Sequence, residues 1–175
     1  MAKAAYATCQ ALPSELQGAL EADDDYTPNG QTCPFGTHIC VVEIDPATGA
    51  SEMLRFVTVD VCGSVINPLL VEGQVHGGIA HGIGQALFEH AIYNYNGQLL
   101  SGTFMDYAVA RADSFPLFET NRMETPSSLN PIGVKGIGEA ATIGSTPAAV
   151  NAVVDALSHL GVRNLDMPLT AEKVW

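Results

Sequence analysis

The segment 71–90 constrains the fold most, because it has the periodicity of an α-helix but the composition of a poor one. Large aliphatic residues recur at every fourth position, namely Val75, Ile79, Ile83 and Leu87. Each glycine in the segment costs an isolated helix about 1 kcal/mol relative to alanine. A second, small-residue face is formed by Gly73, Gly77, Ala80 and Gly84. Such a face favours either close approach of a backbone or a large ligand, or tight helix–sheet packing, and both explanations stay open.

Two β-hairpins are predicted, one before and one after this helix. Residues 37–45 and 52–62 are rich in β-branched residues, and the run 45–49 between them has turn chemistry. The apolar residues of 92–100 flank Asn96-Gly97, a pair that favours a type I′ turn. Further strands are expected at 115–123 and 162–167.

A second helix is expected to open at Ser145-Thr146-Pro147, because a hydroxyl suits the cap and proline suits the first turn. Gly161 is a typical stop signal. The free N–H groups near Thr146 could bind an oxyanion, and a simple capped helix is the alternative. The order of elements predicts an α+β fold, with hairpins and a mixed sheet packed with two main helices. Residues 1–36 are expected to form an irregular N-terminal arm before a domain over 37–175.

Composition excludes several classes of protein. The chain is 47% hydrophobic and 15% charged, which is too apolar for disorder, and no run reaches the ~18 apolar residues of a membrane span. A net charge of −12 leaves no basic face for nucleic acid. The start lacks a signal-peptide pattern, so a cytoplasmic location is expected. The cysteines and histidines lack zinc or iron–sulfur spacing, so no metal bound directly by side chains is expected.

The bend Gly133-Val134-Lys135-Gly136-Ile137-Gly138-Glu139 carries one carboxylate among glycines. Glu139 has apolar neighbours, so we expect it to be desolvated with a raised pKa, as suits a general base. Pairing with Lys135 is the alternative. Gly136-x-Gly138-x-x-Ala141 fits the letters of a dinucleotide fingerprint, but no apolar strand precedes it and the predicted helix begins too late.

Gln74 lies among glycines at the start of the first helix. Its side-chain amide could donate to a ligand oxygen, or it could cap the helix. The two possibilities stay open on the residues alone.

Several motifs occur in one order along the chain, and together they resemble the molybdenum-binding large subunit of the xanthine dehydrogenase and aldehyde oxidase family. The nearest likeness is to the C-terminal part of the carbon monoxide dehydrogenase branch. The motifs are Phe35-Gly36-Thr37-His38, Val59-Asp60-Val61-Cys62-Gly63, Ile66-Asn67-Pro68, Val71-Glu72-Gly73-Gln74-Val75-His76-Gly77-Gly78, Phe104-Met105-Asp106-Tyr107, Glu124-Thr125-Pro126-Ser127, Gly133 to Glu139 and Asp166-Met167-Pro168-Leu169-Thr170.

The resemblance implies that residues 37–175 form the second molybdopterin-binding domain of such a subunit. It implies a molybdopterin cofactor, usually the cytosine dinucleotide form in bacteria, with Glu139 as the active-site base. Gln74 and Gly73 would contact the cofactor, and so would Lys135 and Gly138, which would belong to the same active-site loop. Electrons would leave through iron–sulfur clusters to FAD on partner subunits. The pterin would hold the metal, so no metal-ligating side chain is required.

The chain is far shorter than these subunits, and His81 and Ala141 stand where many relatives carry Gln and Gly. We therefore expect a part of a molybdenum hydroxylase that oxidises a small molecule such as CO, an aldehyde or an N-heterocycle. It would act only with the remainder of the large subunit and with the iron–sulfur and FAD subunits. The alternative is a non-catalytic truncated fragment or assembly module that lacks cofactor.

Overall fold

The computed structural model describes residue 27 and residues 30–175, so most of the predicted arm 1–36 lies outside the described residues. Three strands form one sheet in the order β1-β2-β3: β1 (Phe35–Ile44), β2 (Ser51–Val61) and β3 (Phe118–Met123). β1 and β2 are antiparallel, whereas β3 runs parallel to β2. The mixed sheet of the predicted α+β fold is therefore confirmed.

The first hairpin follows from its turn. The Asp45 carboxylate accepts hydrogen bonds from the Ala47 N–H and the Thr48 hydroxyl, at 2.9 Å and 2.7 Å. Gly49 adopts a φ of +70°, which a residue with a side chain rarely takes. The chain is thereby reversed, and both predicted strands form within two residues of their expected bounds.

Helix α2 (Pro68–Leu87) confirms the first predicted helix but begins three residues earlier. The Asn67 side chain accepts hydrogen bonds from the Leu69 and Leu70 N–H groups, at 3.1 Å and 3.2 Å. Pro68 needs no N–H partner in the first turn. The Asn67-Pro68 pair thus starts the helix, after β2 has already ended at Val61.

Helix α3 (Ala140–Ala156) corrects the second predicted helix, which was expected to open at Ser145-Thr146-Pro147. Pro147 lies inside α3, and the Thr146 hydroxyl donates to the Thr142 carbonyl at 3.0 Å instead of capping a helix end. The proposed oxyanion site at Thr146 is therefore wrong. The stop signal is confirmed: Gly161 has a φ of +86° and follows the short helix η3 (Ser158–Leu160).

Two predicted β segments do not form as expected. In 92–100 only Tyr93 and Leu99 pair, and Asn96 lacks the positive φ that a type I′ turn requires. Gly97 alone is in the left-handed region there, at +78°. The strand expected at 162–167 is absent from the described chain, where that segment is a loop before helix α4 (Ala171–Val174).

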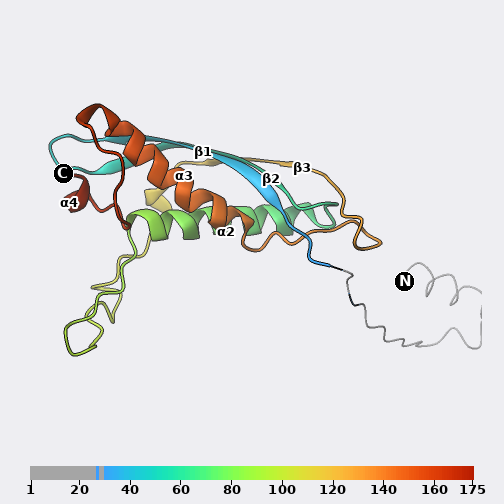
Figure 1. Cartoon of the computed structure of the whole chain (residues 1–175), viewed down its shortest axis with the longest axis horizontal. Coiled ribbons are helices and arrows are strands. Elements are labelled where there is room, and N and C mark those ends of the chain that lie inside the picture. Colours follow the sequence, from blue (N-terminus) through green and yellow to red (C-terminus); the bar gives the residue numbers. More distant parts are fainter. Residues whose placement is uncertain (1–26, 28–29) are drawn as a thin grey trace, which may run out of the picture.

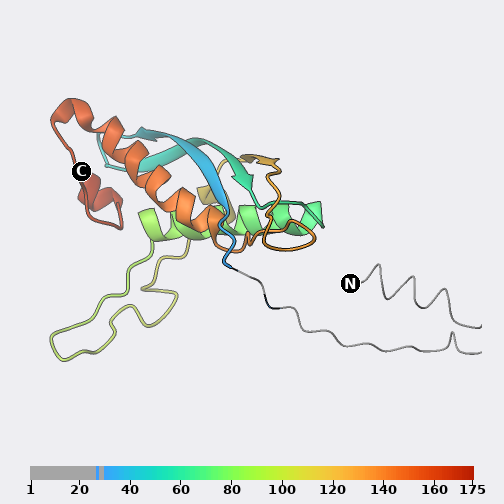
Figure 2. The same cartoon turned by 45° about the vertical axis from the view of Figure 1, so that its right-hand side comes forward.

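The two main helices lie side by side against one face of the sheet (Figures 1 and 2). Phe56 of β2 is fully buried and packs edge-on against Phe118 of β3, with 5.9 Å between ring centroids. Among the described residues, none of the helices is long and apolar enough to cross a membrane. The core is formed by Met53, Phe56, Val75, Ile79, Ile83, Ala86, Leu87, Ala141, Ala149, Val153, Leu157 and Leu169.

Four of the five glycines of α2 form two groups, and the fifth, Gly84, lies against the Glu89 side chain. Gly78 and Gly82 face α3: a Cβ on Gly78 would lie 2.8 Å from the Ala141 Cβ, and one on Gly82 would collide with the Ser145 hydroxyl. By contrast, a Cβ on Gly73 or Gly77 would meet nothing within 4 Å. Close approach of another backbone, that of helix α3, is therefore found at Gly78 and Gly82, which lie outside the predicted small-residue face, and not at Gly73 or Gly77 of that face.

These two groups predict opposite effects of adding one methyl group. Gly82→Ala should lower the free energy of unfolding by about 1–3 kcal/mol, because its Cβ has no room against α3. Gly77→Ala in the same helix should raise it by up to about 1 kcal/mol, because it removes a helix penalty without a clash. Urea denaturation of both variants measures the difference. Equal effects of the two substitutions would contradict the close contact between α2 and α3.

Candidate functional site

The glycine bend is held at the end of β2 by backbone pairing. Gly63 and Val134 form an isolated β-bridge, and the Lys135 N–H donates to the Cys62 carbonyl at 2.8 Å. The Asn130 side chain binds both polar backbone groups of Val134, at 2.8 Å and 3.0 Å. The bend is therefore a fixed structure that delivers the chain into the first turn of α3.

Glu139 is the residue immediately before α3, and its carbonyl accepts from the Ile143 N–H at 3.0 Å. Its side chain is exposed and makes no capping hydrogen bond. The expected desolvation of this carboxylate is therefore wrong for the described chain, because Gly138 and Ala140 are too small to cover it. A carboxylate without a partner in the described chain remains available to a ligand.

Lys135 does not pair with Glu139. Its ammonium group donates to the Thr125 hydroxyl at 3.0 Å and lies 5.1 Å from the centre of the Phe35 ring. This side chain therefore ties the bend to the loop after β3 and to the start of β1. The alternative of a Lys135–Glu139 ion pair is wrong.

Gln74 and Gly138 lie next to each other, although they come from different elements. A Cβ on Gly138 would be 3.6 Å from the Gln74 Oε1 atom. Gln74 is exposed, and the N-terminus of α2 is capped by Asn67, so the helix-capping alternative for Gln74 is wrong. The fold thus brings Gly73 and Gln74 of α2 beside Gly138 and Glu139 of the bend.

The surface around these residues has room for a large group. Nothing lies within 4 Å of a Cβ placed on Gly73, Gly77 or Gly136, so a ligand could approach the backbone there. The N–H groups of the first turn of α3 receive no side-chain cap from Glu139 and favour a negatively charged or oxygen-rich ligand. An amide, backbone donors and open glycines fit a cofactor that is held through oxygen and nitrogen atoms.

The cysteines and histidines supply no metal site in the described part of the chain. No group of three or more His, Cys, Asp or Glu residues there could hold a metal ion. Burial raises the pKa of the Cys40 thiol to about 11, and desolvation is also the main cause of the raised pKa of Cys62. Both thiols are therefore protonated at neutral pH, and the geometry is compatible with a cofactor that carries its own metal.

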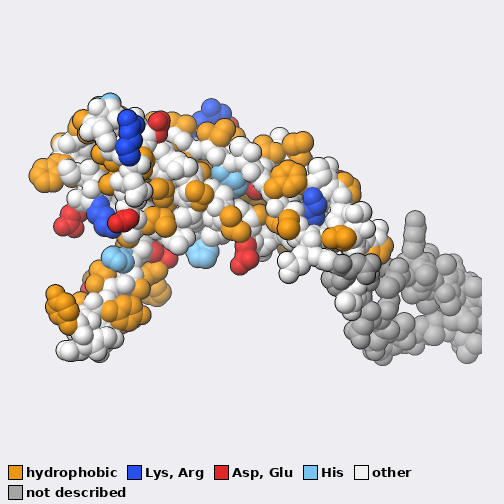
Figure 3. Space-filling model, viewed as in Figure 1, with side chains coloured by type: hydrophobic (Ala, Val, Ile, Leu, Met, Phe, Trp, Pro, Cys, Tyr) orange, Lys and Arg blue, Asp and Glu red, His pale blue; other side chains and the backbone are white. Residues whose placement is uncertain are grey.

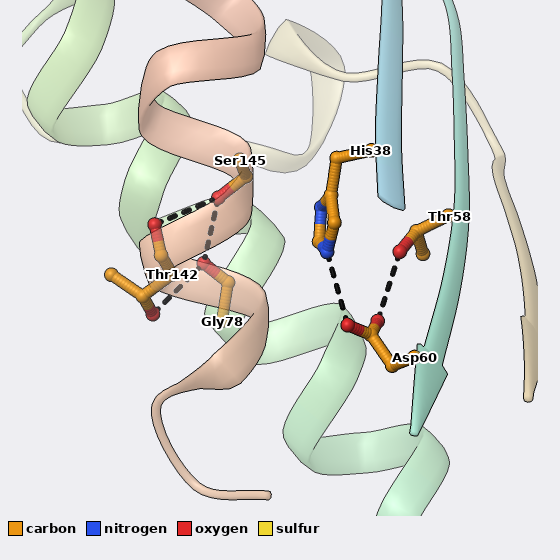
Figure 4. A network of polar contacts seen from close by, with 6 residues as sticks. All are labelled: His38, Thr58, Asp60, Gly78, Thr142 and Ser145. Atoms are coloured by element: carbon orange, nitrogen blue, oxygen red, sulfur yellow. Dashed lines mark hydrogen bonds and ion pairs between the residues drawn. The ribbon is translucent and has the colours of Figure 1, made fainter. Parts of the chain in front are cut away.

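A buried polar network, which sequence reasoning did not predict, lies beneath the first turns of α3 (Figure 4). The Asp60 carboxylate lies 3.1 Å from His38 Nε2 and accepts from the Thr58 hydroxyl at 2.9 Å. A Cβ on Gly144 would be 2.5 Å from the His38 ring, so α3 rests directly on this histidine. His38 and Asp60 both occupy inward-facing strand positions. The alternation of inward-facing and outward-facing residues along β1 and β2 is therefore the sequence signal that could have revealed the network.

On the other side of α3, Thr142 donates to the Gly78 carbonyl of α2 at 3.1 Å, and the buried Ser145 hydroxyl lies 3.4 Å from the same oxygen (Figure 4). The start of α3 is therefore fixed from two sides, by α2 and by the β1–β2 hairpin. Both contacts determine where the bend presents Glu139.

Comparison with known proteins identifies the family. Residues 1–116 match the sequence profile of the molybdopterin cofactor-binding domain. The chain belongs to the molybdopterin cofactor-binding domain family. This result confirms the resemblance to the molybdenum-binding subunits of the xanthine dehydrogenase family.

Relatives of this molybdopterin cofactor-binding domain are similar along its whole length. The carbon monoxide dehydrogenase large chain of Hydrogenophaga pseudoflava is 43% identical over 175 residues, which is 100% of this chain and 22% of that protein. The nicotine 6-hydroxylase large subunit of Paenarthrobacter nicotinovorans is 38% identical over 99% of this chain and 21% of that protein. The structure of reconstituted CO dehydrogenase from Oligotropha carboxidovorans is 38% identical and superimposes with a TM-score of 0.87, covering 98% of this chain and 21% of that one. The chain thus spans about a fifth of the length of these relatives.

Two carboxylates of this molybdopterin cofactor-binding domain should differ sharply in their effect on stability. Asp60→Ala should lower the free energy of unfolding by about 1–3 kcal/mol, because His38 and Thr58 would be left buried without their partner. Glu139→Ala should change it by less than about 0.5 kcal/mol, because that side chain is exposed. Urea denaturation tests both variants, and a large loss for Glu139→Ala would mean that this side chain has a structural role.

Proposed function

We propose that this chain is part of a molybdenum hydroxylase and forms one wall of its molybdopterin site. The observation that supports the proposal best is the position of Gly138 beside the Gln74 side chain, near open glycines and next to the exposed carboxylate of Glu139. The wall is exposed on this chain, so a further part of the large subunit would close the site. The domain over 37–175 would therefore be inactive alone.

Each residue of this wall has a distinct task in the proposal. The Gln74 amide donates to an oxygen of the cofactor, and Gly73, which lacks a side chain, allows the cofactor to lie close to α2. Gly138 keeps the approach to Gln74 open. Lys135 holds the bend through Thr125 and Phe35, so that the loop keeps its shape.

Glu139 acts as the general base in this proposal. A free carboxylate at the first turn of α3 can take a proton from the oxygen that is transferred to the substrate. The bound molybdopterin supplies the redox chemistry, while this chain contributes orientation and proton transfer. The cofactor in the proposal is the cytosine dinucleotide form, and iron–sulfur and FAD subunits of a cytoplasmic complex accept the electrons.

The substrate in the proposal is a small molecule that is oxidised with oxygen from water. Similar proteins are named for carbon monoxide and for nicotine, an N-heterocycle, and aldehydes are the third class of substrate that such a site could take. A non-catalytic fragment or assembly module is the competing function. Glu139 is exposed on the described chain. Without a further part of the large subunit to cover this carboxylate, its exposure favours the non-catalytic alternative.

The base assignment can be tested in a chimera. The matched part of the H. pseudoflava large chain is replaced by this chain, which is 43% identical to it, and expressed with the companion subunits of that enzyme. Glu139→Gln should lower turnover by about 10²–10⁴-fold and leave the molybdenum content unchanged, because only proton transfer is lost. Glu172→Gln in the exposed helix α4 is the matched control. Dye reduction measures turnover, and full activity of Glu139→Gln would rule out the base.

The cofactor contact is tested in the same chimera by Gln74→Ala. We expect less molybdenum per protein, because one donor to the cofactor is removed, while the free energy of unfolding of the isolated chain stays the same. Metal analysis gives the first quantity and urea denaturation the second. Unchanged molybdenum content and turnover would remove Gln74 from the site, and a parent chimera without molybdenum would instead favour the assembly-module alternative.

A further inference from the structure

Residues 92–109, called the hook below, project from the body of the molecule between the end of α2 and the short helix η2 (Ala112–Ser114) (Figures 1 and 2). Large apolar side chains are displayed along it: Met105 is 94% exposed and Phe104 88%. Further exposed apolar residues of the hook are Ile92, Tyr93, Tyr95, Leu99, Leu100 and Val109. Figure 3 shows hydrophobic side chains, coloured orange, on the projection.

The hook carries a single charged residue, Asp106, whose carboxylate accepts a hydrogen bond from Thr103 at 2.8 Å. A loop that functions in water is usually polar, because exposed apolar area is costly and promotes association. The rest of the chain has abundant acidic residues, with a net charge of −12. The lack of charge on the hook is therefore a local property, and it suits contact with an apolar protein surface.

The hook has a defined shape. At its tip the Asn94 side chain accepts from the Asn96 and Gln98 N–H groups, both at 2.9 Å. At its base the Leu100 N–H donates to the Ile92 carbonyl at 2.7 Å. These bonds hold the backbone in one arrangement before any partner binds, which lowers the entropic cost of docking.

The hook is also attached to the body. The Tyr107 hydroxyl donates to the Glu89 carboxylate, just after α2, at 2.7 Å, and this hydrogen bond raises the pKa of Tyr107. Because α2 is a 20-residue helix, its ends are about 30 Å apart. Gln74 is the seventh residue of α2, so it lies about 20 Å along the axis from Leu87. The hook follows that end and is therefore separate from the proposed cofactor wall.

We infer that the hook docks into an apolar groove on the remainder of the molybdenum large subunit. The inference rests on the proposed function. This chain covers only 22% of the length of the H. pseudoflava large chain, so most of such a subunit is available as the partner. A second copy of this chain is the less favourable partner, because two bodies of charge −12 repel each other. The hook would fix the far end of α2 while the cofactor contacts fix the near end.

Hydrogen exchange of residues 92–109 tests the docking directly. Amide exchange is compared between the isolated chain and the chimera with the H. pseudoflava large chain, in the presence of its companion subunits. Docking predicts at least 10-fold slower exchange of the hook in the chimera. Equal exchange in the two proteins would overturn the inference, whatever the molybdenum content of the chimera.

The double variant Phe104→Ser/Met105→Ser supplies the matched comparison. In the isolated chain it should leave the urea midpoint unchanged, because both side chains are exposed there. In the chimera it should restore fast exchange of the hook and lower the thermal midpoint, while turnover per molybdenum stays unchanged. A loss of turnover per molybdenum would place the hook in the site and contradict a purely docking role.

Sedimentation of the isolated chain tests whether a second copy of the chain is the partner of the hook. A monomer with a fast-exchanging hook supports the inference, and a dimer with a protected hook overturns it. A chimera that protects the hook but contains no molybdenum would contradict the proposed function and leave the docking surface intact. The two proposals can therefore fail independently.

Discussion

The close contact between α2 and α3 determines most of what this fold can do. Two helices can approach this closely only where one of them has no side chains, and Gly78 and Gly82 provide that gap. The hydroxyl of Thr142 then reaches the Gly78 carbonyl across the interface. Because α3 begins directly at the glycine bend, the distance between the helices also sets where Gly138 meets Gln74.

The same helix therefore uses glycine for two different purposes. Gly78 and Gly82 are needed for packing, whereas Gly73 and Gly77 face open space and leave part of α2 without side chains. Packing alone gives no reason to keep the second group in a helix. In the proposed function, this uncovered stretch of backbone beside the Gln74 amide and the Glu139 carboxylate is where the cofactor would lie.

Local patterns predicted the hairpin, the first helix and the α+β class, because alternation and a four-residue period survive in the folded chain. The start of α3 was misjudged, since Ser145-Thr146-Pro147 has the chemistry of a helix start but lies within a helix that begins at Ala140. The exposure of Glu139 and the His38–Asp60 contact depend on which segments meet in three dimensions. A single sequence carries little information about which distant segments contact each other in the folded chain.

Helix α2 joins two surfaces that are otherwise separate. Its 20 residues form one continuous helix, with Gln74 in its second turn and the hook beyond its C-terminal end. Under the two proposals, a partner that holds the hook also holds the helix that carries Gln74. Docking of the hook and binding of the cofactor would then be coupled through this one helix.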